Sequence, residues 1–321
     1  MTVTVIIPVK NGSHTLERCL SSIRKQTIGS FLEIIVLDSM STDSSREIAK
    51  KYNAIIIDIP TDTFNHGSTR NIGVKAATSE NVFFTVQDAY FADENMLDKM
   101  LVHFKDDNIR AVTGHQAVPH DKNKNPAFWF KRFTQPVIEV KHFANPMDLE
   151  NLKPAQKVAK LHWDNVVALY RKKALLEIPF IKTDFAEDAF WCYEALLHGW
   201  TLLCDPSIVV FHYHHKTFNY SYQVSWAVNF HFFTFFKYKP KISPFFSLMA
   251  RRIYHLLRHK ELSFTEKLYW IKYNLIAELG NSKAVFEFLW QLNWRGQQGI
   301  TNSYFKRCKK IPQGKQNFYK N

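Results

Sequence analysis

Two adjacent carboxylates, Glu187 and Asp188, are the residues whose types and spacing best fit catalysis in this chain. They open an apolar segment with helical spacing that stops at Gly199. Acids in a first helical turn also complement the helix dipole, so simple capping is the alternative interpretation. Asp88 and His212 each follow another apolar run. Because carboxylates and imidazoles hold cations and accept protons from hydroxyl groups, Asp188 is predicted to be a catalytic base.

The elements that must position these residues alternate between strand and helix in the first half of the chain. Strands are predicted at 3–8, 34–37, 54–57 and 82–86, and helices are predicted to begin near Ser13, Ser44 and Ser68. Short links between them indicate a mostly parallel sheet with helices on both faces. Ligands bind at the carboxyl ends of the strands in such sheets. Asp38 and Asp88 stand at two of these ends, although Asp38 also fits a turn-shaping role.

Phosphate-binding signatures of the common kind are missing, since the sequence contains neither G-x-G-x-x-G nor a Walker P-loop. A bound nucleotide would therefore be held in another way. Arg70 is a candidate contact, with an ordinary solvated helix charge as the alternative. In strand geometry His212 and His214 point the same way, with Tyr213 opposite. The two histidines fit a metal or diphosphate role and a structural role about equally.

Composition narrows the class of protein. The 321 residues are 46% hydrophobic, which suffices for one large domain or a domain with an appendage. The net charge of +13 favours an anionic partner: nucleic acid, a phosphorylated substrate or an acidic membrane surface. Four scattered cysteines favour a reducing compartment. No signal peptide or membrane-spanning run is recognised, so a soluble or peripheral protein is predicted.

Two regions of the second half have competing interpretations. The segment from about 115 to 160 is predicted to be an irregular loop. It either forms part of the side of the site that binds the acceptor, or it is a surface insertion. After Lys216 the chain becomes aromatic, basic and helical. It carries the basic residues Arg251, Arg252, Arg258, Lys260, Arg307, Lys309 and Lys310. This region is either a helical bundle with solvated charges or a peripheral membrane face anchored by Trp270, Tyr273 or Trp290.

Four short motifs follow one another in the first half. They are Pro8 to Asn11, Asp38 to Asp43, Phe64 to Asn71 and Gln87 to Ala89, and residues 180–191 and 212–214 extend them. Their order and spacing resemble the family-2 inverting glycosyltransferases of the GT-A fold, and within that family the bacterial rhamnosyltransferases that use a dTDP-activated sugar. The resemblance covers roughly residues 3–215. It implies a GT-A domain at 1–215 and a C-terminal helical region at 216–321.

The resemblance implies catalytic and metal-binding roles. Asp188 would be the base of the Glu-Asp motif, next to Glu187, and Asp88 would be the last position of an Asp-x-Asp metal motif. The first acid of that motif is replaced by Val86. Either His212 helps to hold a divalent cation (Mg²⁺ or Mn²⁺), or the cation is weakly bound, or cation dependence is reduced. A single Asp can suffice where phosphate oxygens supply the remaining ligands.

The resemblance also implies a nucleotide site. Asp38 would accept a hydrogen bond from the pyrimidine base and Arg70 would contact the nucleotide, with Pro8, Asn11 and Gln87 in the same site.

The predicted function is the transfer of a sugar, rhamnose from a dTDP-sugar, with inversion to a hydroxyl of a cell-surface glycan or a lipid-linked acceptor. The alternatives are a UDP-sugar donor, or a non-catalytic module that binds nucleic acid or lipid. A sugar nucleotidyltransferase is disfavoured because residues 8–11 are not a glycine-rich signature. A nucleic-acid partner is not expected. The predicted location is the cytoplasm, with peripheral attachment to an anionic inner membrane surface.

Overall fold

The computed structural model describes residues 1–28 and 32–308, and the chain forms two compact units. The first unit contains residues 1–117 and 131–212, and the second contains 118–130 and the chain from 213 onward. Lys309 and Lys310, which belong to the predicted basic face, lie outside the described residues.

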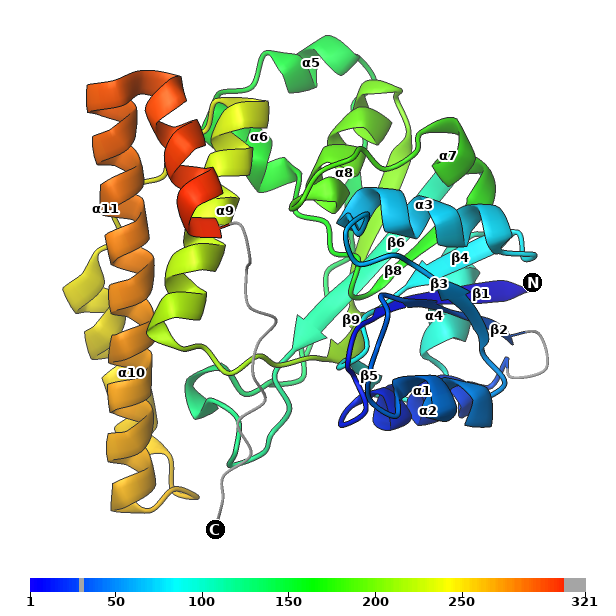
Figure 1. Ribbon diagram of the computed structural model, residues 1–321, viewed down its shortest axis with the longest axis horizontal. Coiled ribbons are helices and arrows are strands. Elements are labelled where there is room, and N and C mark those ends of the chain that lie inside the picture. The colour runs from blue at the N-terminus through cyan, green and yellow to red at the C-terminus, as the bar shows by residue number, and fades with distance from the viewer. Residues whose placement is uncertain (29–31, 309–321) are drawn as a thin grey trace. The chain divides into compact units, whose positions relative to one another are not determined.

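A mixed sheet of nine strands, counted over the described residues, forms the centre of the first unit (Figure 1). Its order is β3-β2-β1-β4-β8-β6-β9-β5, with β7 paired to β9. The strands are β1 (Val3–Val9), β2 (Leu32–Asp38), β3 (Ile55–Asp58), β4 (Asn81–Phe84), β5 (Tyr90–Phe91), β6 (Ile109–Ala117), β7 (Glu139–Lys141), β8 (Ala168–Arg171) and β9 (Thr201–Phe211). β1 to β4 pair in parallel, whereas β8 is antiparallel to both β4 and β6.

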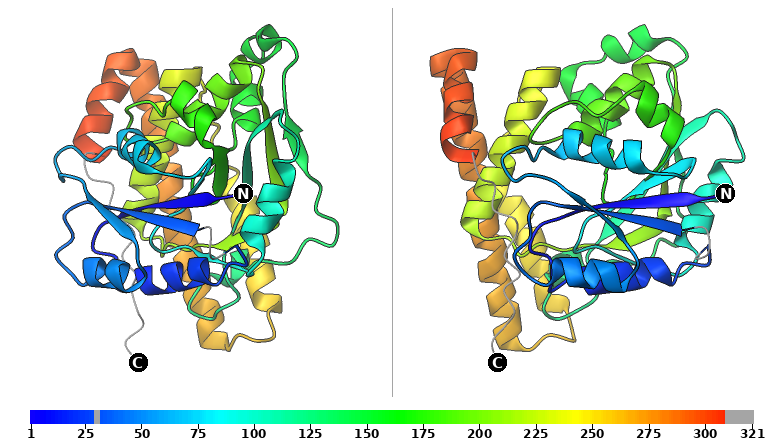
Figure 2. Two further views of the ribbon diagram at one scale, coloured as in Figure 1. Left: turned by 90° about the vertical axis from the view of Figure 1, so that its right-hand side faces the viewer. Right: turned by 45° about the vertical axis from the view of Figure 1, so that its right-hand side comes forward.

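Helices cover both faces of this sheet, as predicted (Figures 1 and 2). They are α1 (Leu16–Arg24), α2 (Ser45–Lys51), α3 (His66–Ala76), α4 (Met96–His103), α5 (Pro146–Glu150), α6 (Pro154–Lys160), α7 (Lys172–Glu177) and α8 (Glu187–Leu197). Successive strand residues point to opposite faces, so Val5 joins the core under α1 and α4. On the other face, Ile6 lies so close to α3 that a Cβ on Gly73 would be 2.7 Å from its Cγ2.

The predicted helices exist, and two details of their first turns differ from a simple serine cap. α1 begins after Thr15 rather than at Ser13, and Ser44 makes no capping bond with its side chain. Asp43 replaces it, because its Oδ1 accepts from the backbone N–H of Ser45 at 3.0 Å. Asp43, one residue earlier, thus satisfies one of the orphan backbone donors in the first turn of α2.

The region 115–160 is more regular than predicted. β6 continues to Ala117 because it pairs with β9, and β7, α5 and α6 follow. β9 is likewise one strand, although the apolar runs 202–204 and 208–211 on either side of Asp205-Pro206 suggest two, and its register against β6 shifts along its length. Cross-strand pairing is a tertiary effect that local turn residues do not reveal.

The second unit is helical. It contains η2 (Pro126–Phe128), α9 (Phe218–Phe236), α10 (Phe245–Arg258) and α11 (Phe264–Cys308), and α11 packs along α9 (Figure 2). α11 joins the two amphipathic stretches at 262–279 and 284–294 that the sequence suggests as separate, and it is kinked at Gly296, where φ is +59°. Trp270 and Tyr273 are 1% and 7% exposed, in a core with Trp129 and Leu256. Both are therefore excluded as interfacial anchors. Within 1–28 and 32–308, no helix has the length and apolarity needed to cross a membrane.

Candidate active site

The Glu-Asp pair occupies the first turn of α8. Ala186, directly before it, has a φ of +63°, which a residue with a side chain seldom adopts. Glu187 is 6% exposed, and its Oε1 lies 2.7 Å from Nη1 of Arg70 on α3. Asn165 Nδ2 donates to the same oxygen at 3.2 Å. Glu187 is thus held from two sides, which fixes the start of α8.

A chain of buried hydrogen bonds extends this contact into the core. Trp163 Nε1 donates to the Tyr170 hydroxyl at 2.7 Å, and that hydroxyl donates to Asn165 Oδ1 at 2.6 Å. The Tyr170 ring packs edge-on against Trp191 of α8, with 4.7 Å between centroids. Since its polar members are paired, this network gives Asn165 one orientation and so fixes its bond to Glu187.

The surroundings of the two carboxylates shift their pKa values in opposite directions. Burial raises the pKa of Asp188 to about 8, and the negative charges of Glu187 and Asp164 add to the effect. Burial alone would also raise the pKa of Glu187, but Arg70, followed by His66, lowers it below its ordinary value. When two adjacent acids have different pKa values, the one with the lower pKa stays ionised and the one with the higher pKa exchanges the proton. Asp188 is the member poised to exchange a proton near neutral pH.

Asp188 is also fixed in position. Its Oδ1 accepts from the backbone N–H of Ala189 at 2.7 Å, and its Oδ2 lies 3.4 Å from the backbone N of Asn165. Burial raises the pKa of Asp164, whose Oδ2 accepts from Gln116 Nε2 at 2.8 Å.

α3 is joined closely to the loop before α8. Asn65 caps α3 by accepting from the backbone N–H of Ser68, and the same Oδ1 accepts from the backbone N–H of Thr183. Asn71 exchanges two hydrogen bonds with the backbone of Phe180, at 2.8 and 3.1 Å. A Cβ on Gly67 would lie 2.0 Å from the carbonyl oxygen of Ile181, so only glycine permits this approach.

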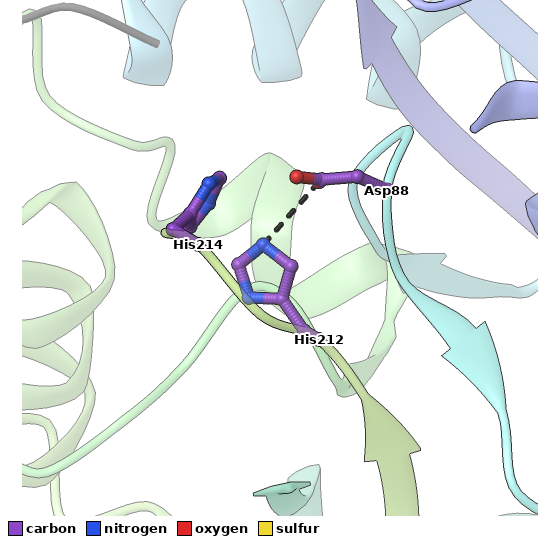
Figure 3. Close-up of side chains that lie close together, drawn as sticks. All are labelled: Asp88, His212 and His214. Carbon is purple, nitrogen blue, oxygen red and sulfur yellow. Dashed lines mark ion pairs between the residues drawn. The ribbon is translucent and has the colours of Figure 1, made fainter. Parts of the chain in front are cut away.

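A candidate cation site lies where β9 ends. His212 Nε2 is 3.3 Å from Asp88 Oδ1, and Figure 3 shows the two side chains meeting. His214 follows two residues later, and the three residues can each offer a ligand atom within 4.8 Å of the others. Val86 packs against the hydrophobic core and adds no oxygen. A carboxylate with imidazoles fits Mn²⁺ better than Mg²⁺, which prefers oxygen ligands.

The predicted nucleotide residues lie at the carboxyl ends of β1 and β2. Asp38 is 1% exposed, forms an ion pair with Arg46 at 2.9 Å and accepts from the backbone N–H of Ser41 at 3.2 Å. Asn11 has a φ of +48°, and its Oδ1 accepts from the backbone N–H of Thr42 at 2.8 Å. The turn-shaping role left open for Asp38 is therefore present, and its contact with a base stays a prediction.

Pro8 and Gln87 belong to the same edge of the sheet. Pro8 is in β1, paired with Leu37 of β2. Gln87 accepts from the backbone N–H of Lys10 at 2.8 Å, which ties the ends of β1 and β4 together. Arg70 is 4% exposed and directed at Glu187. The nucleotide contacts of these three residues also stay predictions.

The sequence analysis missed Asp164, Asn165 and Tyr170. Their one signal was position, since the apolar run 165–170 predicts a strand that begins at Asn165, directly after Asp164, and ends at Tyr170. An acid and an amide at a strand start are ordinary, and only the packing of α8 against this strand gives them a role.

Comparison with known proteins identifies the family. The profile described as Glycosyl transferase family 2 matches residues 4–175, more than half of the chain. The chain belongs to this family and is a glycosyltransferase, so a non-catalytic binding module is set aside.

Two curated relatives transfer rhamnose by name. The O-antigen chain rhamnosyltransferase WbaN of Salmonella anatum is 34% identical over 221 residues, 67% of each chain. The O-antigen chain rhamnosyltransferase RfbN of Salmonella typhimurium (strain LT2) is 31% identical over 225 residues, 68% of each chain.

Solved structures confirm the GT-A fold. S. aureus TarS in complex with UDP-GlcNAc superimposes with a TM-score of 0.56 and 18% identity, covering 97% of this chain and 82% of that one. The mannosyltransferase PcManGT from Pyrobaculum calidifontis, in complex with GDP-Man and Mn²⁺, superimposes with a TM-score of 0.54 and 17% identity. The superposition covers 96% of this chain and 85% of that one.

Proposed function

We propose that the protein transfers rhamnose from a dTDP-sugar, with inversion, to a hydroxyl of a cell-surface glycan or a lipid-linked acceptor. The observation that carries the catalytic part of this proposal is the placement of Asp188 in the first turn of α8, held by backbone N–H groups beside the buried Glu187–Arg70 ion pair. Two rhamnosyltransferases among the relatives support the choice of sugar. In one displacement, the acceptor oxygen bonds to the anomeric carbon while the bond to the diphosphate breaks. Asp188 takes the hydroxyl proton, which contributes about 10²–10⁴-fold to the rate.

The proposed cofactor is a divalent cation held by Asp88 and His212, with His214 as a further ligand. When bound, it would neutralise negative charge on the departing diphosphate. The nitrogen ligands predict that Mn²⁺ binds more tightly than Mg²⁺. Calorimetry with each metal tests this: His212→Ala should weaken Mn²⁺ binding at least several-fold, and unchanged binding would remove His212 from the site.

Donor screening with the purified protein tests the function. Transfer or slow hydrolysis is expected with dTDP-rhamnose and is expected to be lost in Asp188→Asn. UDP-sugars are the competing donors, because TarS was solved with UDP-GlcNAc. Turnover of a UDP-sugar alone would replace the proposed donor, and turnover of neither class would refute the proposal.

We further propose that the enzyme works in the cytoplasm at an anionic membrane surface. Residues 213–321 contain 18 Lys and Arg against four Asp and Glu, whereas residues 1–212 contain 24 against 25. The positive charge of the chain is therefore concentrated after residue 212, beyond the part that holds Asp188, Asp88 and His212. Such a segment is attracted to anionic lipid by about 1 kcal/mol for each basic residue near the surface.

A further inference from the structure

α11 has two apolar faces, and only one of them is buried by packing within the second unit. Its buried face includes Trp270, Ala277, Ala284 and Phe288, and packs within the second unit. A second set of apolar side chains remains between 38% and 63% exposed. It consists of Leu268, Leu275, Leu279, Phe286 and Trp290. We call this set the α11 stripe.

The stripe is continuous along one side of the helix. Its members are separated by seven, four, seven and four residues, a spacing that returns side chains to the same face. At 1.5 Å per residue it is about 33 Å long. A face of this length on a surface helix is ordinarily polar, and a large exposed apolar patch marks an interaction site.

The charges around the stripe are basic. Lys272 and Lys283 are exposed and follow stripe residues by four positions, which places them along the same side. The three acidic residues of α11 all have partners within the unit. Glu266 accepts from the backbone N–H of Ser263 at the start of the helix, and Glu287 lies 3.7 Å from Lys283, whose side chain stays 54% exposed. Glu278 is buried against Arg252 at 3.1 Å, and Glu287 pairs with Arg307 at 3.4 Å.

We propose that the α11 stripe is a docking face for an anionic lipid bilayer, with its apolar side chains at the acyl boundary and its lysines among the headgroups. This inference rests on the proposed function, because it names the helix face through which the enzyme would contact the membrane. A helix with one apolar side and basic flanks binds parallel to a bilayer surface. A second copy of the chain fits less well, because two segments with 18 basic and four acidic residues would face each other and repel.

Tryptophan fluorescence offers a test that reads this face directly. Trp290 is 43% exposed and Trp294 is 77% exposed. Of the other six tryptophans, Trp200 is partly exposed and five are buried. Vesicles of phosphatidylcholine and phosphatidylglycerol with brominated acyl chains should quench the emission of the wild type. The variant Trp290→Phe/Trp294→Phe should lose this quenching, and Trp200→Phe should keep it.

Co-sedimentation with the same vesicles, without bromine, measures binding. Leu279→Ser/Phe286→Ser should reduce the bound fraction at least several-fold. The matched control Ile55→Ser/Val102→Ser changes side chains of similar exposure in the first unit and should bind like the wild type. Donor turnover on an acceptor in solution should be unchanged in both pairs, so loss of vesicle binding is separable from failure of the enzymatic proposal.

Three outcomes would overturn the inference. They are equal binding of the stripe variant and the wild type, quenching that persists without Trp290 and Trp294, and equal binding to vesicles of phosphatidylcholine alone. A dimer in light scattering that Leu279→Ser/Phe286→Ser dissociates would assign the stripe to a second copy instead.

Discussion

At the scale of residues, the surroundings of Glu187 and Asp188 give these two neighbouring acids different pKa values. Glu187 is held as an anion by Arg70 and Asn165, whereas Asp188 has no comparable positive partner among the contacts described and is desolvated next to that anion. Sequence analysis could select Asp188 because an acidic pair at a helix start is visible in the sequence. It could not order the two pKa values, which depend on an arginine more than 100 residues away.

Asp188→Asn should lower turnover at least about 10²-fold while leaving nucleotide affinity nearly intact. Only the ionised carboxylate can accept a proton, so the wild-type rate should rise with pH up to the pKa of about 8 and fall about tenfold per unit below it. Steady-state kinetics from about pH 6 to about pH 9, with dTDP binding by calorimetry as the control, measure both effects. Near-normal turnover in the variant would reduce Asp188 to a helix cap.

Asp164→Asn should move the midpoint of the pH–rate profile to lower pH. Removing a negative charge near Asp188 makes its ionised form less costly, so its pKa falls. Glu187 and Arg70 also act on Asp188 and are unchanged in this variant. The exposed Asp184, which lies beside Asn65, provides the control: Asp184→Asn should leave the midpoint in place. A midpoint unmoved by Asp164→Asn would show that the two carboxylates are not coupled.

At the scale of elements, the strands and helices of the first unit were predictable because their apolar spacing is strong. The antiparallel β8 and the regular structure within 131–160 were not, since both depend on partners distant in the sequence. The join between α3 and the loop before α8 was hidden for the same reason. Asn65, Gly67 and Asn71 look like parts of an ordinary helix start until residues 180–183 are placed beside them.

Gly67→Ala should disturb this join. The added methyl would meet the carbonyl oxygen of Ile181, and backbone cannot yield as a side chain does. A destabilisation of about 1–3 kcal/mol is expected, as for overpacking, together with lower turnover because the loop leads into Glu187 and Asp188. Thermal unfolding and steady-state kinetics measure the two losses. Ile72→Ala, at an exposed position of the same helix, should change neither, and an unaffected Gly67→Ala would mean that the loop shifts freely.

At the scale of the whole molecule, most of the proposed catalytic residues and most of the excess basic charge lie in different parts of the chain. The part that holds Asp188, Asp88 and His212 is nearly neutral, whereas the part after residue 212 is strongly basic. The sequence showed the total charge, and the fold showed that the basic part is a separate helical unit. Attraction to a membrane and binding of the donor should therefore respond differently to salt.

Raising the salt concentration from about 0.05 M to about 0.5 M should reduce transfer to an acceptor embedded in anionic vesicles several-fold. The Debye length falls from roughly 14 Å to roughly 4 Å over this range, which screens exposed lysines and arginines from the bilayer. Transfer to an acceptor in solution should change less than about twofold, because Asp188 is half-buried next to the buried Glu187–Arg70 pair and such groups are screened much less. Measuring both acceptors in the same buffers, with dTDP affinity alongside, separates the two effects. Equal salt dependence for the two acceptors would show that the basic unit does not act through the membrane.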